Sequence, residues 1–126
     1  MHVRVRIPEK SRVFLLEDSD HRIKWFRERL PNIVVATNVE DAIKILSEAV
    51  FDFVFLDHDL QLVDYQSYKE SRTGTGRDVA KFLSGTGFVG KNVFIHSWNS
   101  MGAAAMKDCL AGAYAIPFGQ FEIEIV

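Results

Sequence analysis

The sequence predicts an α/β domain built on a five-stranded parallel sheet. Three observations predict it: short apolar runs alternate with segments of helical periodicity, the central runs are apolar on both faces, and polar clusters directly follow three of them. Strands that alternate with helices form parallel sheets with right-handed crossovers. Strands covered by helices on both sides are apolar on both faces. Residues 1–126 are expected to form one domain of this class.

The first half of the chain supplies three strands and two helices. Asp18, Ser19 and Asp20 provide N-cap chemistry for the first helix, and Thr37 and Asn38 can cap the second. In the first helix, apolar residues recur at helical spacing, with Arg and Lys on the other face. The predicted strands are 12–16, 33–36 and 53–56, and the predicted helices are about 20–30 and 39–49.

The second half begins with a long connection, residues 58–75, that shows no clear periodicity. Loops of this length in compact domains are usually functional or disordered. Gly112 is a good terminator for the last helix. The predicted elements are a helix from 76 to about 84, a strand at 92–95, a helix at 100–110 and a short strand at 114–116.

The two ends of the chain carry complementary patterns. The N-terminal segment alternates apolar and basic residues, and the C-terminal segment alternates apolar and acidic residues. Laid antiparallel, Arg4 faces Glu124 and Arg6 faces Glu122, and opposed charges at such positions contribute about 0.2–1 kcal/mol per pair. We therefore predict that the termini pair as a β ribbon. Two separate edge strands are the alternative.

Composition excludes several classes of protein. Of the 126 residues, 48% are hydrophobic and 25% charged, which is typical of a globular domain. No apolar run approaches the roughly 20 residues of a membrane span, and the N-terminus lacks the apolar core of a signal peptide, so we expect a cytoplasmic protein with no membrane partner. The net charge of −2 without a basic block argues against tight binding to a long duplex. The single Cys109 is predicted to be a buried, inert thiol.

Polar clusters directly follow three of the predicted strands. Parallel strands end at a common edge, where ligands of open α/β sheets bind, so these clusters are predicted to meet. Like charges so close repel unless a metal ion or a shared proton compensates, which points to a site for chemistry. The residues concerned are Glu17, Asp18, Asp57, His58, Asp59, His96, Ser97 and Asn99.

Each of these residues also has an ordinary structural explanation. An acid at a strand end is commonly an Asx turn, Asp18 can be a helix cap, and His96 can be a packing histidine. Functionally, carboxylates with imidazole suit a divalent metal such as Mg, Mn or Zn. We predict Glu17, Asp18 and Asp57 as metal ligands.

The remaining polar residues fit phosphate chemistry. His58 and His96 can act as general base and general acid, with Asp57 and Asp59 completing the catalytic group. Ser97 and Asn99 can donate hydrogen bonds to phosphate oxygens. The segment 73–77 begins a helix whose backbone amides and Arg77 form a candidate anion site. For Arg77, a plain solvated helix position is the alternative.

The layout resembles the response-regulator receiver domain over nearly the whole chain. Glu17-Asp18 match the acidic pair after the first strand, Asp57 the phosphoacceptor, and Ser97 the small hydroxyl residue after the fourth strand. The resemblance implies a flavodoxin-like three-layer sandwich with strand order 2-1-3-4-5. Ile116 stands where receivers carry the lysine that contacts the phosphoryl group, and the usual final helix is missing.

Three motifs are more specifically similar to the cyclic-phosphate-processing receiver-like family, found among phages and bacteria. They are Leu56-Asp57-His58-Asp59-Leu60, Thr75-Gly76-Arg77-Asp78-Val79-Ala80 and His96-Ser97-Trp98-Asn99. The resemblance implies a phosphoesterase that acts on cyclic phosphate ends of nucleotides or RNA. The alternatives are a divergent receiver phosphorylated on Asp57 and a pseudo-receiver that binds a nucleotide or protein without turnover. Trp98 is expected in the core or as a lid, with a base-stacking platform as the alternative.

Overall fold

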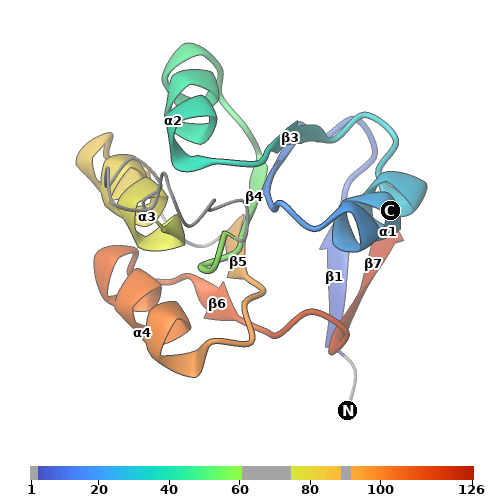
Figure 1. Cartoon of the computed structure of the whole chain (residues 1–126). Coiled ribbons are helices and arrows are strands. Elements are labelled where there is room, and N and C mark those ends of the chain that lie inside the picture. The colour runs from blue at the N-terminus through green and yellow to red at the C-terminus, as the bar shows by residue number, and fades with distance from the viewer. Residues whose placement is uncertain (1–2, 61–74, 89–91) are drawn as a thin grey trace.

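A five-stranded parallel sheet in the order β3-β2-β4-β5-β6 forms the centre of the protein (Figure 1). The computed structural model describes residues 3–60, 75–88 and 92–126, so most of the predicted 58–75 connection lies outside the described residues. The strands are β2 (Val13–Leu16), β3 (Val34–Ala36), β4 (Phe53–Leu56), β5 (Val93–Ile95) and β6 (Tyr114–Ala115). Counted along the sheet-forming strands, this is the predicted order 2-1-3-4-5, which confirms the receiver-like α/β fold.

Four helices connect these strands, and each begins at a residue whose side chain caps it. The helices are α1 (Asp20–Arg29), α2 (Val39–Glu48), α3 (Gly76–Gly85) and α4 (Ser100–Cys109). Their caps are Ser19, Asn38, Thr75 and Asn99, each accepting a hydrogen bond from a backbone N–H in the first turn. Such caps satisfy amides that have no partner within the helix. The predicted boundaries hold to within about two residues.

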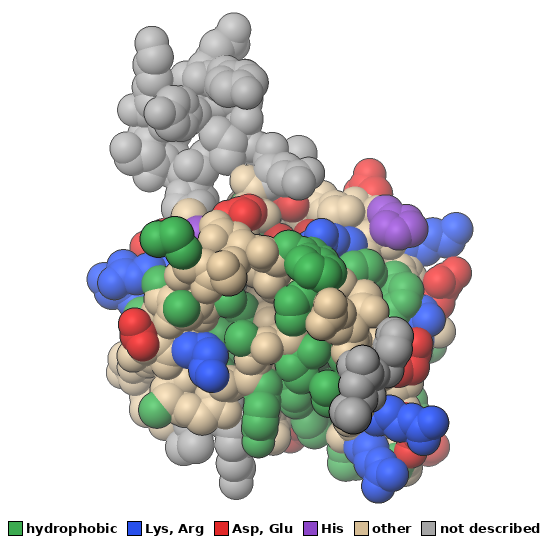
Figure 2. Space-filling view, turned by 90° about the horizontal axis from the view of Figure 1, so that it is seen from below, with side chains coloured by type: hydrophobic (Ala, Val, Ile, Leu, Met, Phe, Trp, Pro, Cys, Tyr) green, Lys and Arg blue, Asp and Glu red, His purple; other side chains and the backbone are tan. Residues whose placement is uncertain are grey.

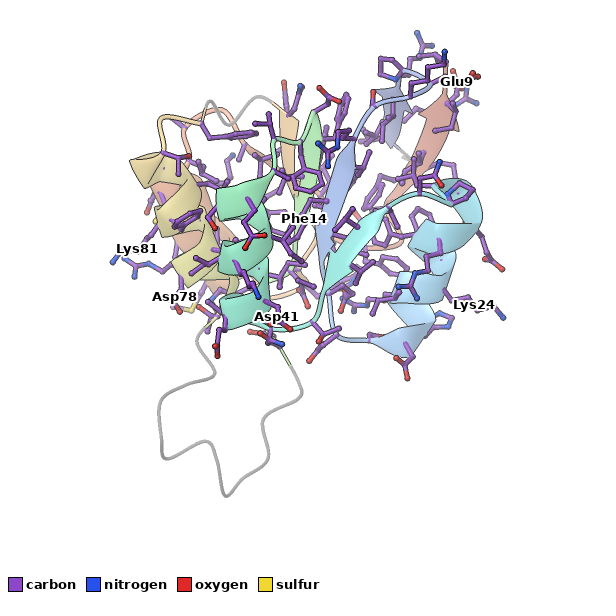
Figure 3. The ribbon with its side chains drawn as sticks, turned by 90° about the horizontal axis from the view of Figure 1, so that it is seen from above. Glu9, Phe14, Lys24, Asp41, Asp78 and Lys81 are labelled. Carbon is purple, nitrogen blue, oxygen red and sulfur yellow. The ribbon has the colours of Figure 1, made fainter. Side chains whose placement is uncertain are left out.

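The helices divide between the two faces of the sheet. Helices α2, α3 and α4 cover one face, and α1 lies on the other (Figure 1). Phe14 of β2 is fully buried against the three-helix layer. Figure 3 shows Phe14 inside the molecule, whereas Lys24 of α1 and Lys81 of α3 point outward. Cys109 is only partly buried, so its predicted full burial is wrong, although it packs against the same layer.

A two-stranded ribbon completes the face that α1 only partly covers. It pairs β1 (Val3–Ile7) with β7 (Phe121–Ile125), and we call it the terminal ribbon. Its inner residues, among them Phe121, pack on Phe26 and Phe55. The terminal ribbon, rather than a final helix, follows β6 in the described chain, as the sequence predicts.

The terminal ribbon is parallel, so the predicted antiparallel direction is wrong. Arg4 lies opposite Glu122 and Arg6 opposite Glu124, and both arginines reach Glu124 at 3.6 Å. Connectivity explains the direction. Strand β1 must finish near the start of β2, and β7 must start near the end of β6, so both run opposite to the central strands. Alternating charges fit either direction and could not decide between them.

Candidate functional site

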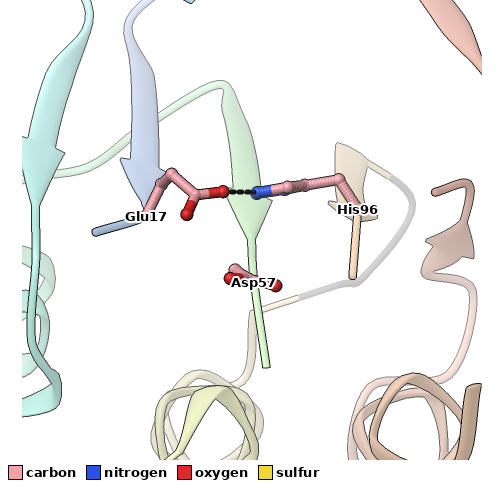
Figure 4. A group of neighbouring side chains, drawn as sticks. All are labelled: Glu17, Asp57 and His96. Atoms are coloured by element: carbon pink, nitrogen blue, oxygen red, sulfur yellow. Dashed lines mark hydrogen bonds and ion pairs between the residues drawn. The ribbon is translucent and has the colours of Figure 1, made fainter. Parts of the chain in front are cut away.

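Three polar side chains meet at the C-terminal ends of adjacent strands. Glu17 follows β2, Asp57 follows β4 and His96 follows β5, and their ligand atoms all lie within 4.8 Å of one another (Figure 4). Backbone hydrogen bonds continue the sheet to this point: Asp57 N donates to Leu16 O at 3.1 Å, and His96 N to Leu56 O at 3.0 Å. We call these three residues the acid–imidazole cluster.

Glu17 is the best-connected member of the cluster. Its Oε1 accepts a hydrogen bond from His96 Nε2 at 2.8 Å, and its Oε2 accepts from the backbone N–H groups of Asp18 and Ser19 at 3.1 Å each. Arg22 Nη1 lies 3.7 Å from Oε1. Burial alone raises the pKa of Glu17, but the hydrogen bonds and the charges of His96 and Arg22 outweigh it and lower that pKa. Glu17 is therefore an anion at neutral pH.

Asp57 is buried but incompletely satisfied. Its Oδ1 accepts a hydrogen bond from His58 N at 2.9 Å, whereas its Oδ2 accepts none from the described residues. Burial raises the pKa of Asp57 to about 6, with the negative charge of Glu17 adding to the effect and the charge of His96 opposing it. The cluster thus keeps one carboxylate oxygen available to a proton or a cation.

His96 is completely buried, with its ring 5.4 Å from that of Phe26. Its Nε2 is engaged with Glu17, and its Nδ1 is the one buried side-chain N or O atom in the described chain that has no partner. These contacts fit a residue that acts on Glu17 and Asp57 rather than one that touches a substrate directly.

His58 and Asp59 form a second group next to the cluster. His58 Nδ1 lies 2.7 Å from Asp59 Oδ1, which also accepts a hydrogen bond from Asn99 Nδ2 at 3.1 Å. The hydrogen bond from His58 lowers the pKa of Asp59, against slight burial, and Asn99 adds to the effect. The His58 ring rests on Gly102, where a Cβ atom would overlap it. His58 Nε2 makes no hydrogen bond to the described residues, so the carboxylate fixes the ring and leaves this nitrogen free.

Ser97 and Asn99 shape the turn between β5 and α4. Ser97 Oγ accepts a hydrogen bond from Asn99 N at 3.0 Å, and Asn99 Oδ1 accepts one from Gly102 N at 2.9 Å. The Ser97 hydroxyl proton remains able to donate. The Asn99 amide is already used to cap α4 and to hold Asp59, so its position in this structure is that of an organising residue.

Two predicted residues are not members of the cluster. Asp18 is half-buried and is not among the three residues grouped within ligand distance in the described chain. Arg77 is exposed in the first turn of α3, where the amides of Gly76, Arg77 and Asp78 bond to His58 O, Thr75 Oγ1 and Thr75 O. Those amides are therefore occupied by the chain itself, so residues 76 and 77 do not offer the free backbone amides on which the prediction for 73–77 relied; residues 73 and 74 lie outside the described residues.

Sequence reasoning missed Arg22 and Phe118. It placed the arginines and lysines of α1 together on the face opposite the apolar residues, yet Arg22 contacts Glu17 and its guanidinium lies 5.0 Å from the centre of the Phe118 ring. The available signal was position, because a residue in the first turn of α1 follows β2 closely and stays near the site. Trp98 is 57% exposed, so the expectation of a core position is wrong.

The acid–imidazole cluster fits a divalent cation. Metal–ligand bonds of about 2.0–2.2 Å place two ligands of one ion up to about 4.4 Å apart, so a small contraction from 4.8 Å brings all three together. The free Oδ2 of Asp57 and the unpartnered Nδ1 of His96 are donor atoms without protein partners in the described chain. Two carboxylates and an imidazole suit Mg, Mn or Zn.

The fold and the site define a receiver-like α/β domain with a buried acid–imidazole cluster at the C-terminal edge of its sheet. The chain belongs to the cyclic-phosphate processing receiver domain family, whose sequence model matches residues 13–112. The matched region contains the whole cluster and four of the five strands of the central sheet, β2 to β5, but neither β6 nor the two strands of the terminal ribbon.

Solved receiver structures share the fold. The response regulator protein TrrA from Thermotoga maritima, solved in complex with Mg²⁺-BeF, superposes with a TM-score of 0.63 at 16% identity, covering 86% of this chain and 89% of that one. A LuxR-family two-component response regulator from Aurantimonas sp. SI85-9A1 gives a TM-score of 0.59 at 16% identity, covering 84% and 71%. At such identities the likeness concerns the fold alone. No protein with a curated description matches the sequence.

The described part of the chain contains no helix long and apolar enough to cross a bilayer.

Proposed function

We propose that this protein is a phosphoesterase that hydrolyses cyclic phosphate ends of nucleotides or RNA. Membership of the cyclic-phosphate processing family supports the proposal. The observation that carries it is the placement of a carboxylate-oriented imidazole, His58, directly beside a buried carboxylate with a free oxygen, Asp57. Such a pair supplies proton transfer and charge at one place.

Opening a cyclic phosphodiester requires a proton to move twice. Water attacks phosphorus, one phosphorus–oxygen ester bond breaks, and the departing ribose oxygen takes up a proton. His58 Nε2 accepts the proton of the attacking water and returns it to the leaving oxygen, while Asp59 holds Nδ1 and stabilises the protonated ring. A positioned acid–base residue of this kind contributes about 10²–10⁴ in rate.

Glu17, Asp57 and His96 would hold a divalent cation, with Asp18 as a further candidate ligand. When bound, the cation supplies positive charge to the phosphoryl oxygens as negative charge develops on them. His96 acts in this proposal through Glu17 and Asp57. The Ser97 hydroxyl donates to a phosphate oxygen, Asn99 holds Asp59, and the exposed Arg77 attracts the anionic substrate.

The decisive experiment is a turnover assay on a nucleoside 2′,3′-cyclic phosphate with Mg²⁺, Mn²⁺ or Zn²⁺ and with chelator. Turnover that falls about 10²–10⁴-fold in His58→Ala and is lost in Asp57→Ala supports the proposal. His96→Ala tests the indirect role, and His21→Ala, an exposed histidine of α1, is the matched control. Wild-type protein that binds the nucleotide but forms no product with any metal contradicts the proposal and favours a binding pseudo-receiver.

A second candidate function is a receiver phosphorylated on Asp57. The observation that favours it is the free Oδ2 at the position that resembles the receiver phosphoacceptor. Ile116 stands where receivers carry a lysine, and it packs against the apolar layer on the α1 side of the sheet. Incubation with a small-molecule phosphodonor, followed by intact mass measurement, separates the candidates. A phosphoryl adduct that is absent from Asp57→Asn would favour signalling.

A further inference from the structure

Three residues beside the acid–imidazole cluster have contacts that the proposed chemistry does not use. Phe118 lies at their centre: its backbone N donates to His96 O at 2.8 Å, and its backbone O accepts from Trp98 Nε1 at 2.9 Å. The guanidinium of Arg22 lies over the Phe118 ring, 5.0 Å from its centre. Arg22 and Trp98 are thus both supported on one residue that is itself tied to His96.

Arg22 is suited to a phosphate. In the described chain it is the one lysine or arginine that pairs with the cluster, through Nη1 at 3.7 Å from Glu17 Oε1. That distance exceeds the 2.7–2.9 Å typical of charge-assisted hydrogen bonds, so the guanidinium keeps its donors for another acceptor. Its side chain is 27% exposed. Arg22 therefore places a cation beside Glu17, whereas the side chain of Ile116 carries no charge.

Trp98 is suited to an aromatic ring. More than half of its surface, 57%, is exposed, which is unusual for so large an apolar side chain. Its indole N–H is bonded to Phe118 O, so the ring is held in one orientation instead of turning freely. A fixed, exposed aromatic face next to a phosphate-chemistry site is what stacking on a nucleobase requires.

Hydrophobic side chains also gather on the surface of the described molecule. Figure 2 views it from below and shows them on that face, with charged side chains around its edge. A flat apolar ligand part such as a nucleobase is buried favourably against an exposed aromatic ring such as that of Trp98.

We propose that Arg22, Phe118 and Trp98 form a nucleotide subsite, in which Arg22 binds the phosphate and Trp98 stacks on the base. The inference rests on the proposed function for its reaction and assigns the residues that would bind the phosphate and the base of the nucleotide. Both groups contact Phe118, Arg22 at the ring and Trp98 at the backbone carbonyl, so one residue holds the phosphate-binding and the base-binding side chain. A cyclic phosphodiester without a base would use only the Arg22 half.

The test compares two substrates, a nucleoside 2′,3′-cyclic phosphate and ethylene glycol cyclic phosphate, which has the same ring but no base. Trp98→Leu is expected to raise the KM for the nucleotide about 5- to 150-fold, the range for loss of one stacked base. Its kcat for the nucleotide and its kinetics with the base-free substrate stay unchanged. Arg22→Gln is expected to weaken the binding of both substrates and so to raise both KM values. Arg22→Lys is expected to restore part of this lost affinity.

Matched controls separate the subsite from general surface effects. Tyr114→Leu removes a similarly exposed aromatic ring that stacks on Phe94, and Arg27→Gln removes an exposed cation of the same helix. Both are expected to behave as wild type. A wild-type KM of Trp98→Leu for both substrates would overturn the subsite, and so would wild-type kinetics of Arg22→Gln. Either result would leave the proposed hydrolysis unaffected.

A binding measurement keeps the two proposals distinguishable. Equilibrium dialysis with the nucleoside cyclic phosphate measures affinity without turnover. Nucleotide binding that depends on Trp98 and Arg22, in a protein that hydrolyses nothing, would retain the subsite and remove the phosphoesterase. Absence of binding to wild type at millimolar nucleotide would overturn the subsite directly.

Discussion

The ionised form of Asp57 is unfavourable in the folded protein. Its pKa rises from an ordinary 3.8 to about 6 because the carboxyl is buried beside Glu17. A group whose pKa is raised in the folded state binds more protons there than in the unfolded chain, so stability falls as pH rises between these two values. The shift corresponds to an upper bound of about 3 kcal/mol at pH 7.

Asp57→Asn is therefore expected to stabilise the protein at neutral pH by up to about 3 kcal/mol. Between about pH 4 and pH 6 the wild type loses stability relative to the variant, because only the wild type must ionise this group. Urea unfolding at several pH values measures the difference. Asp108→Asn, at an exposed position on α4, is the control. A difference between wild type and Asp57→Asn that does not vary with pH would contradict the raised pKa.

A bound divalent cation should offset the destabilisation that the ionised Asp57 causes. At pH 7.5, Mg²⁺, Mn²⁺ or Zn²⁺ is expected to raise the melting temperature of the wild type, since a cation bound to the ionised cluster stabilises the folded state. The increase should shrink below pH 6, where Asp57 becomes protonated. Glu17→Gln and Asp57→Asn should lose it. A metal-induced increase of equal size in both variants would place the ion elsewhere.

At the level of elements, the first turn of α4 positions the His58–Asp59 pair. Gly102 leaves room for the His58 ring, and Asn99 both caps the helix and holds Asp59. The sequence predicted Asn99 as a phosphate ligand. A polar residue directly after a strand gives the same sequence pattern whether it caps the next helix or binds a ligand. Only the packing of α4 against residues 57–59 reveals its organising contacts.

Gly102→Ala tests this arrangement. The added Cβ would overlap the His58 ring, which must move because the helix backbone is held by its own hydrogen bonds. We expect turnover of a nucleoside cyclic phosphate to fall about 10²-fold or more, while the chain still folds. Gly85→Ala in α3, where a Cβ meets no atom within 4 Å, is the matched control. Wild-type turnover in Gly102→Ala would show that the position of this ring is unimportant.

At the scale of the whole molecule, the sequence predicted the central sheet well and the terminal ribbon only partly. Apolar runs and caps are local signals, so strands such as β2 and caps such as Ser19 were identified correctly. The convergence of Glu17, Asp57 and His96 followed from parallel topology alone. The direction of the terminal ribbon depends on where the chain enters and leaves the sheet, and the contact of Arg22 depends on how α1 lies, neither of which is encoded in periodicity.

The terminal ribbon lies outside the family match and yet supports the site. Phe121 of β7 is 2% exposed and packs its ring near those of Phe26 and Phe55, and Phe26 in turn lies 5.4 Å from the His96 ring. Phe121→Ala should destabilise the domain by about 3–5 kcal/mol, the usual cost of removing a buried phenyl ring. Ile125→Ala, on the same strand but 45% exposed, should cost far less.

Urea unfolding of the two variants measures this contrast. Below the unfolding transition, Phe121→Ala should also lower turnover, because a cavity next to Phe26 loosens the ring that holds His96 against Glu17. If the free energy of unfolding of Phe121→Ala equals that of Ile125→Ala, the terminal ribbon only covers the sheet. If Phe121→Ala loses stability without any change in turnover, the terminal ribbon contributes to folding only and does not support the acid–imidazole cluster.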